Sequence, residues 1–180
     1  MEKSLLRKEM CILRNNVLFT AEKNCQILKK VLKLFEEEKY SSVFSYVSMN
    51  SEVDTKGIIT SLLGKIDVFV PHTLPDYMFP VRFNGGVSLN KVDRLGNVYE
   101  CPVDSNIVPQ VTITPLLAFN SQLYRLGYGG GYYDKFFAKT STIRIGLAFD
   151  EQEVDNISID KYDVSLDVII TPTRILRRLT

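Results

Sequence analysis

The chain has 180 residues, of which 45% are hydrophobic and 24% charged, as expected for one globular domain with a proper core. Its 22 basic and 21 acidic residues leave a formal net charge of +1, which excludes a general field for nucleic acid or an anionic membrane. The sequence shows no apolar stretch of membrane-spanning length and no signal-peptide pattern. We therefore expect a cytoplasmic protein with no nucleic-acid or membrane partner.

Cysteine and histidine usage argues against several kinds of chemistry. Cys11, Cys25 and Cys101 lie far apart, without the paired spacing of a zinc site or a disulfide framework, so we interpret them as reduced thiols. His72 is the only histidine, which argues against a Ser-His-Asp triad and against a histidine metal cluster. The sequence offers no classical catalytic acid or base, and the catalytic residues stay unassigned.

The first part of the chain combines helical and strand patterns. Helical spacing of apolar residues predicts two helices, the second with Thr20 as its N-cap, and Gly64 should end a third. A strand, a helix and a strand then follow one another, which favours a βαβ unit and a mainly parallel sheet. The predicted helices cover residues 3–15, 20 to the charged run 36–39, and 55–63, and the predicted strands cover residues 42–47 and 68–70.

The second part is irregular before it becomes regular again. Residues 79–83 could form an edge strand, and residues 84–109, rich in Gly, Asn, Asp and Pro, predict an extended loop region. We then predict a strand at 111–114, a glycine-rich turn, a helix from about 132 to 138, and strands at 143–149 and 168–171. The expected fold is a single α/β domain over residues 1–180, with a mixed, mainly parallel sheet flanked by helices.

The glycine-rich turn, residues 125–134, reads RLGYGGGYYD and carries four glycines in five positions. Glycines permit positive φ and close approach, so several backbone N–H groups can point at one phosphate. Arg125 and Lys135 add positive charge, and Asp134 offers a carboxylate to a phosphate-bound Mg²⁺. The alternative is a tight turn over packed aromatic side chains. The run matches neither a Walker A motif nor a dinucleotide fingerprint.

Several motifs resemble the 5-formyltetrahydrofolate cyclo-ligase family, also called methenyltetrahydrofolate synthetase. The most specific is PLLAFN at 115–120 with YRLGYGGGYYD at 124–134. Weaker matches in the family's order are KSLLR at 3–7, SMNSE at 48–52 and DVSLD at 163–167. Two departures are visible: Asn120 stands where the family often has aspartate, and residues 96–102 match the family's Gly-Ile-x-Glu-Pro segment only loosely, so we take no site residue from there.

The resemblance implies a fold like that of sugar-phosphate isomerases and CoA-transferases. It also implies conversion of 5-formyltetrahydrofolate and ATP into 5,10-methenyltetrahydrofolate, ADP and phosphate, with Mg²⁺. The formyl carbon on N5 is an amide carbon, and phosphorylation of its oxygen would create the leaving group that N10 displaces. Phosphoryl transfer needs positioning and charge neutralisation more than a strong base, so a chain with one histidine is suited to it.

The same resemblance assigns the site residues. Lys3 and Arg7 lie four apart and share a helix face, which would otherwise be interpreted as a solvated basic face. Without the resemblance, Glu52 would be interpreted as a solvated acid and Val47 as core. For ATP, the family implies Lys3, Arg7, Arg125, Leu126, Gly127, Tyr128, Gly129, Gly130, Gly131, Tyr132 and Tyr133. For the folate, it implies Val47, Glu52, Tyr128, Gly129, Gly130, Gly131 and Tyr132.

For Mg²⁺, the resemblance implies Asp134 and Asp163. Asp167 is a rival to Asp163, because a small error in register would exchange them. We expect a monomer whose partners are ATP and 5-formyltetrahydrofolate, with the preference for a polyglutamate tail left open.

Two other functions stay open. One is a sugar-phosphate isomerase or acyl-CoA transferase, which would need a glutamate or histidine base for which we find no motif. The other is a nucleotide- or folate-binding regulator that has lost the chemistry. Retention of the predicted charged residues together argues against that loss.

Overall fold

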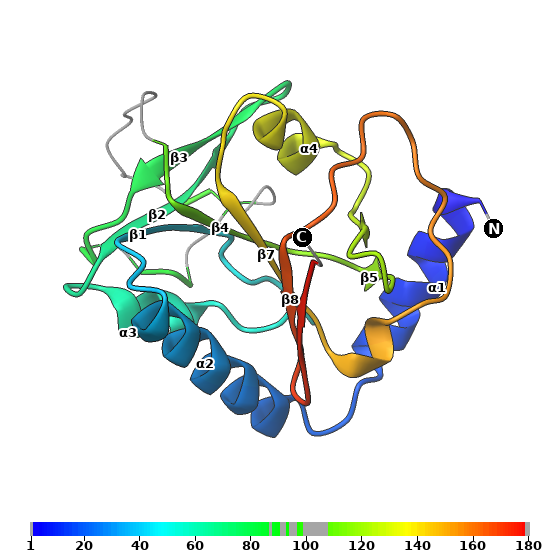
Figure 1. The fold of residues 1–180 in the computed structure, drawn as a ribbon, viewed down its shortest axis with the longest axis horizontal. Helices are drawn as coiled ribbons and strands as arrows, with labels where there is room; N and C mark the ends of the chain where they lie inside the picture. The colour runs from blue at the N-terminus through cyan, green and yellow to red at the C-terminus, as the bar shows by residue number, and fades with distance from the viewer. Residues whose placement is uncertain (1, 87, 91–92, 94–96, 99–107, 179–180) are drawn as a thin grey trace.

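A computed structural model describes residues 2–86, 88–90, 93, 97–98 and 108–178 (Figure 1). Its helices are α1 (Lys3–Asn15), α2 (Thr20–Glu37), α3 (Lys56–Leu62), α4 (Tyr132–Phe137) and the 3-10 turn η1 (Asp150–Gln152). Its strands are β1 (Ser42–Ser45), β2 (Asp67–Thr73), β3 (Met78–Arg82), β4 (Val111–Thr114), β5 (Ala118–Phe119), β6 (Arg125–Leu126), β7 (Ile143–Leu147), β8 (Val168–Ile170) and β9 (Ile175–Arg177).

Seven strands form the main sheet in the order β3-β2-β1-β4-β7-β8-β9. The five central strands are parallel, and β3 and β9 pair antiparallel at the two edges. The predicted βαβ unit is present, because β1 and β2 pair in parallel on either side of α3 in the sequence. The predicted fold, α/β with a mainly parallel mixed sheet flanked by helices, is confirmed.

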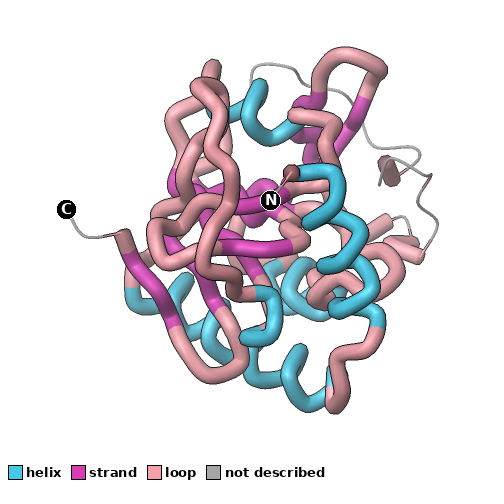
Figure 2. Tube along the Cα trace, turned by 90° about the vertical axis from the view of Figure 1, so that its right-hand side faces the viewer, coloured by secondary structure: helices cyan, strands magenta, loops and turns pink. Residues whose placement is uncertain are grey.

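Helices cover both faces of the sheet (Figures 1 and 2). On one face, α2 and α3 contribute Ile27, Val31 and Ile58 to a core shared with the central strands. On the other face, the buried Phe136 and Phe137 of α4 belong to the cluster that includes Phe44, Phe69 and Ile169 of the sheet. Burying such side chains stabilises the fold by roughly 1.5 to 3 kcal/mol each, before the entropy cost is counted.

Helix α1 packs at the side of the sheet, against the β5–β6 hairpin. Leu6 and Met10 are buried with Leu117, Ala118 and Leu126. Leu126 ends β6, and the glycine-rich loop, residues 127–131, begins at the next residue. This packing therefore places α1 beside the loop. No helix in the described part of the chain has the length and apolar character needed to span a membrane.

Several element ends differ from the sequence predictions. Thr20 is the first residue of α2, not its N-cap; the N-cap is Phe19, whose φ of 57° is left-handed, and no side chain caps this helix. Strand β2 does not end before Pro71 but continues to Thr73, paired with β3. Proline is tolerated at this position because the pairing of β2 with β1 has already ended at Phe69, so its missing N–H costs no bond to β1. Much of the predicted loop at 84–109, with Cys101, lies outside the described residues.

Three short elements were not predicted. Strands β5 and β6 have two residues each and β9 has three, which is too short for a periodic pattern. As a result, the glycine-rich loop follows a hairpin and not a strand of the main sheet. The strand predicted at 143–149 ends earlier, at Leu147, and its last two residues lead into η1.

Candidate active site

A cavity of about 600 Å³ opens at the carboxyl ends of β1, β2 and β4. Val47 follows β1, Thr73 ends β2 and Pro115 follows β4, and all three line the cavity. Ligands of α/β proteins bind at this edge of the sheet, and the volume is typical of a small-molecule site. The predicted site residues that line it are Lys3, Arg7, Val47, Glu52, Arg125, Leu126, Gly127, Tyr128, Gly129, Gly130, Gly131, Tyr132, Tyr133, Asp134 and Asp163.

The glycines of the loop serve different purposes. Gly129 and Gly131 have φ of 101° and 68°, which side chains rarely adopt, so at these two positions glycine is required by the turn itself. A Cβ on Gly130 would lie 2.8 Å from the ring of Tyr132. At Gly127, by contrast, a Cβ would meet no atom of the described residues within 4 Å, and φ is not left-handed. Among the four glycines of the loop, Gly127 is the one for which neither the space around it nor its φ explains why glycine is present.

The backbone donors of this loop are available to a ligand. Within the described part of the chain, none of the N–H groups of residues 127–131 donates to a protein acceptor. Gly127 and Gly131 are half-buried and residues 128–130 are exposed, so these N–H groups are open to solvent and, beside a cavity, can serve an anion. The phosphate cradle stays a prediction, which these available N–H groups suit; α4, which follows them, is short, with six residues.

Arg7 of α1 contacts the loop directly. Its Nε donates to the carbonyl of Gly127 at 2.9 Å. A Cβ on Gly129 would lie 3.4 Å from the guanidinium carbon, so the guanidinium also borders the second glycine. The packing of Leu6 and Met10 sets the position of this helix, and Arg7 therefore brings a permanent positive charge to the cradle.

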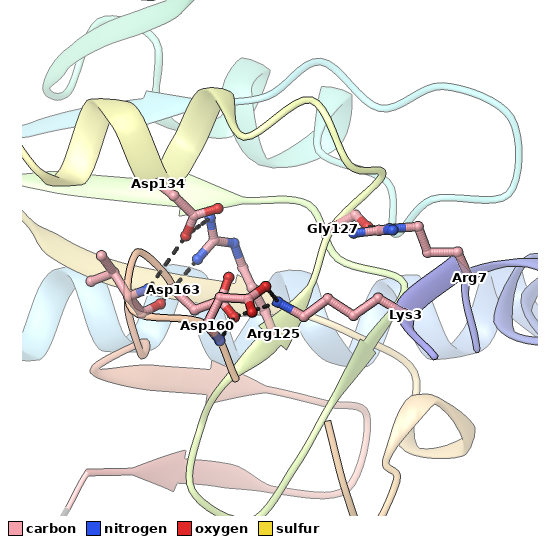
Figure 3. A network of polar contacts seen from close by, with 8 residues as sticks. Lys3, Arg7, Arg125, Gly127, Asp134, Asp160 and Asp163 are labelled. Atoms are coloured by element: carbon pink, nitrogen blue, oxygen red, sulfur yellow. Dashed lines mark hydrogen bonds and ion pairs between the residues drawn. The ribbon is translucent and has the colours of Figure 1, made fainter. Parts of the chain in front are cut away.

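Lys3, one turn earlier, reaches the segment before β8 (Figure 3). Its Nζ lies 2.6 Å from a carboxylate oxygen of Asp160 and 2.5 Å from one of Asp163. Burial acts to lower the pKa of Lys3, but the bonds to these two carboxylates outweigh it and the pKa lies above its ordinary value. The same oxygen of Asp163 accepts from the backbone N–H of Asp160 at 2.7 Å. Sequence reasoning missed Asp160, because the matched motif begins at Asp163.

Arg125 and Asp134 form the second ion pair of the site (Figure 3). Arg125 Nη2 donates to Asp134 Oδ1 at 3.1 Å and Nη1 to the carbonyl of Val164 at 3.1 Å. The Arg125 side chain is only 4% exposed, and burial lowers its pKa against the opposing effect of Asp134. The Asp134 carboxylate accepts both of its hydrogen bonds, from Arg125 and from the backbone N–H of Val164, through Oδ1, so among the described residues Oδ2 has no partner.

The two predicted rivals for a Mg²⁺ ligand lie in different surroundings. Asp163 lines the cavity, whereas Asp167 binds Arg144 with both oxygens, at 2.7 and 2.8 Å, outside it. The described residues contain no group of three or more His, Cys, Asp or Glu that could hold a metal. Two carboxylates nevertheless suit Mg²⁺, which keeps several waters and takes its remaining ligands from substrate phosphates. Lys135 does not line the cavity and instead donates to the carbonyl of Asp76 at 3.4 Å.

Glu52 is oriented from two sides. Its Oε1 accepts from the hydroxyl of Tyr128 at 2.7 Å, and its Oε2 accepts from the backbone N–H of Met49 at 2.8 Å. The turn that follows β1 makes the second bond possible, because Glu52 N donates in return to the Met49 carbonyl at 3.1 Å. Val47 is 2% exposed and belongs to the core cluster, and it also lines the cavity, so its contact with a substrate stays a prediction.

Aromatic residues complete the wall of the cavity. Tyr46 is buried and Tyr133 is half-buried, and burial together with the charge of Glu52 raises the pKa of each above its ordinary value. The Tyr46 hydroxyl donates to the carbonyl of Val53 at 2.9 Å and the Tyr132 hydroxyl to that of Pro75 at 3.2 Å. The phenols of Tyr46 and Tyr133 therefore stay neutral, and the wall of the cavity is apolar with few polar groups.

Fold and site together define an α/β protein with a ligand cavity at the carboxyl ends of its parallel strands. The sequence model of the "5-formyltetrahydrofolate cyclo-ligase family" matches residues 1–172, and the chain belongs to this family. It is therefore an enzyme of the ligase class, as the sequence motifs predicted.

Individual relatives agree with this assignment. The chain is similar to the 5-formyltetrahydrofolate cyclo-ligase of Haemophilus influenzae, with 28% identity over 180 residues, which cover 92% of this chain and 95% of the relative. It is 32% identical over 171 residues to the probable 5-formyltetrahydrofolate cyclo-ligase of Caenorhabditis elegans, covering 80% of this chain and 79% of that one. In fold, it resembles the NMR structure of Aquifex aeolicus 5,10-methenyltetrahydrofolate synthetase, with a TM-score of 0.82, 24% identity, and coverage of 98% of this chain and 93% of that one.

Proposed function

We propose that this chain converts 5-formyltetrahydrofolate and ATP into 5,10-methenyltetrahydrofolate, ADP and phosphate in the presence of Mg²⁺. Family membership supports the reaction. The observation that carries the assignment to this site is the convergence of α1, the turn after β1 and the glycine-rich loop on one cavity of about 600 Å³. At one part of that cavity lie basic side chains and free backbone N–H groups. At another lie the carboxylate of Glu52, which two hydrogen bonds hold in place, and aromatic side chains.

In the first step, the formyl oxygen attacks the γ-phosphorus of ATP. A P–O bond to the formyl oxygen forms and the P–O bond to ADP breaks. Lys3 and Arg7 would bind the phosphates together with the N–H groups of residues 127–131, so charge is stabilised where it develops. Asp134 and Asp163 would hold Mg²⁺, which when bound neutralises phosphate charge and orients the transferred group.

In the second step, the N10 lone pair attacks the formyl carbon. The C–N10 bond forms, the C–O bond breaks with departure of phosphate, and N10 loses its proton. Because the attack is intramolecular, correct positioning can supply several kcal/mol of the barrier. Glu52 would accept hydrogen bonds from N–H groups of the pterin, and Val47 with Tyr128 and Tyr132 would hold the ring between apolar surfaces.

Purified protein mixed with ATP, Mg²⁺ and 5-formyltetrahydrofolate tests the proposal through methenyl absorbance and ADP release. We expect both products in equal amounts, and neither when ATP or the folate is omitted or the divalent ion is chelated. Binding of ATP and folate without turnover would instead identify a regulator. Full turnover in EDTA would contradict the metal requirement.

A further inference from the structure

Arg14 is a buried arginine that sequence reasoning missed. It lies in the last turn of α1, is 5% exposed, and does not line the cavity. It sits seven residues after Arg7 and four after Met10, on the helix face that packs against the hairpin. A charged side chain on the apolar face of an amphipathic helix is a signal for a specific partner, because an unpaired buried charge is costly.

The guanidinium of Arg14 binds three segments that surround the cavity. Nη2 donates to the hydroxyl of Tyr128 at 2.6 Å, Nε to Ser51 Oγ at 3.1 Å and Nη1 to the carbonyl of Leu116 at 3.2 Å. Its Cζ also lies 5.5 Å from the centroid of the Tyr128 ring. These segments are the glycine-rich loop, the turn after β1 and the chain after β4, which α1 therefore holds together.

The chemistry of the partners sets the direction of this hydrogen-bond chain. Arginine can only donate, and an ionised carboxylate can only accept. Tyr128 lies between them, accepting from Arg14 at 2.6 Å and donating to Glu52 at 2.7 Å, so its single hydroxyl proton is directed to Glu52. Burial and the charge of Glu52 raise the pKa of Tyr128, with Arg14 opposing them, so the phenol keeps this proton at neutral pH.

We propose that Arg14 is a positioning residue for the folate site: it orients the phenol of Tyr128 and, through it, the carboxylate of Glu52. This inference rests on the proposed function, because it assumes that Glu52 binds the pterin. Arg14 touches no ligand in this account. Its effect should therefore fall on the folate and spare ATP, whose proposed phosphate ligands lie earlier on α1 and on the backbone of the loop.

Arg14→Met keeps most of the side-chain stem and removes every donor, so it tests the proposal directly. We measure dissociation constants for 5-formyltetrahydrofolate and for Mg·ATP by calorimetry, and KM for each in turnover. Folate affinity should fall about tenfold, as for loss of a charged hydrogen-bond partner, while ATP affinity should change less than about threefold. Arg14→Lys, which keeps the charge and one directed donor, should recover part of the loss.

Two further variants separate positioning from general stability. In a Tyr128→Phe background the chain to Glu52 is already broken, so Arg14→Met should then change folate affinity less than about twofold. Arg144→Met removes another ion-paired arginine, bonded to Asp167 outside the cavity, and should lower the melting temperature with folate affinity unchanged.

Three results would overturn the inference. They are equal losses of folate and ATP affinity in Arg14→Met, additive effects with Tyr128→Phe, and wild-type folate affinity in Arg14→Met. In the last case the wild-type enzyme still turns over and only the role of Arg14 is wrong. If the wild type itself neither binds nor converts the folate, both the proposed function and the role of Arg14 are wrong.

Discussion

At the scale of single residues, Gly127 offers the cleanest test of the phosphate cradle. In the described part of the chain, a methyl group there meets no atom within 4 Å, so Gly127→Ala should change the free energy of unfolding by less than about 0.5 kcal/mol. If phosphate approaches this backbone closely, the same methyl group should raise KM for ATP roughly tenfold, equivalent to about 1.4 kcal/mol. Steady-state kinetics with ATP varied and a thermal melt measure the two effects.

Gly86→Ala is the matched control, because its added methyl also meets no atom within 4 Å among the residues that the structure describes, and Gly86 does not line the cavity. An unchanged KM for ATP in Gly127→Ala would mean that phosphate binds elsewhere. Gly130→Ala is a poorer test, since a methyl group would collide with the ring of Tyr132 and mix stability with binding.

The carboxylate of Glu52 gives a second prediction at this scale. Glu52→Gln keeps the shape of the side chain but turns charged acceptors into neutral ones, so the interaction with pterin N–H groups should weaken. Charged hydrogen bonds contribute about 1.5 to 3 kcal/mol, so folate affinity should fall roughly tenfold or more. ATP affinity should stay within a factor of three or so. Equal loss of both ligands would show that Glu52 supports the fold of the turn after β1.

At the scale of elements, we expect the basic residues of α1 to bind ATP and to contribute little to the stability of the fold. Lys3→Ala and Arg7→Ala should each raise KM for ATP several-fold. The stability cost should be about 1 kcal/mol, because Lys3 pairs with carboxylates near the surface, Asp160 (67% exposed) and Asp163 (23% exposed), and Arg7 donates to the carbonyl of Gly127. Lys8→Ala, on the exposed side of the same helix, is the control. A fall in melting temperature with unchanged KM would make the pair structural.

The contact between β7 and the residue before β8 predicts a dependence of stability on pH. Burial acts to raise the pKa of Asp167, but hydrogen bonds from the side chain and backbone of Arg144 outweigh it, so the pKa is lowered. The stabilisation is therefore present above the ordinary aspartate pKa of about 3.9 and is lost as pH falls through the lower folded value. Asp167→Asn should cost about 1 to 2 kcal/mol at pH 7 and much less near pH 2. Denaturant melts at both pH values measure this, and an equal cost at both would contradict it.

The longer helices and strands were predictable from the sequence because the apolar residues of the buried face repeat in a regular pattern. The stripe that includes Val31 and Phe35 predicted α2, and the run from Val111 predicted β4 to the residue. The left-handed Phe19 and strand β9 were not predictable, because only tertiary packing selects them. In the site, motifs identified most of the residues that touch the cavity. They missed Asp160, which lines it and pairs with Lys3, and Arg14, which lies outside it and bonds to Tyr128, because both depend on partners far away in the sequence.

At the scale of the whole molecule, the fold brings distant segments to one point. Arg7 contacts Gly127, 120 positions later, and Lys3 contacts Asp163, 160 positions later. The hairpin of β5 and β6 makes this possible, because α1 packs on it and the glycine-rich loop starts where it ends. A site assembled in this way depends on the docking of α1, so we expect activity to be lost before the central sheet unfolds in mild denaturant. Activity and far-UV circular dichroism along one urea series measure this, and coincident transitions would contradict it.

The central claim is that ATP activates the formyl oxygen of the folate. The most direct measurement uses 5-formyltetrahydrofolate with ¹⁸O in the formyl group, turned over with unlabelled ATP in ordinary water, and mass analysis of the phosphate released. If the oxygen is phosphorylated and then leaves with phosphorus, each phosphate carries one ¹⁸O atom and ADP carries none. Unlabelled phosphate, formed while methenyl product accumulates, would show that ATP hydrolysis and ring closure proceed without this bond and would contradict the account.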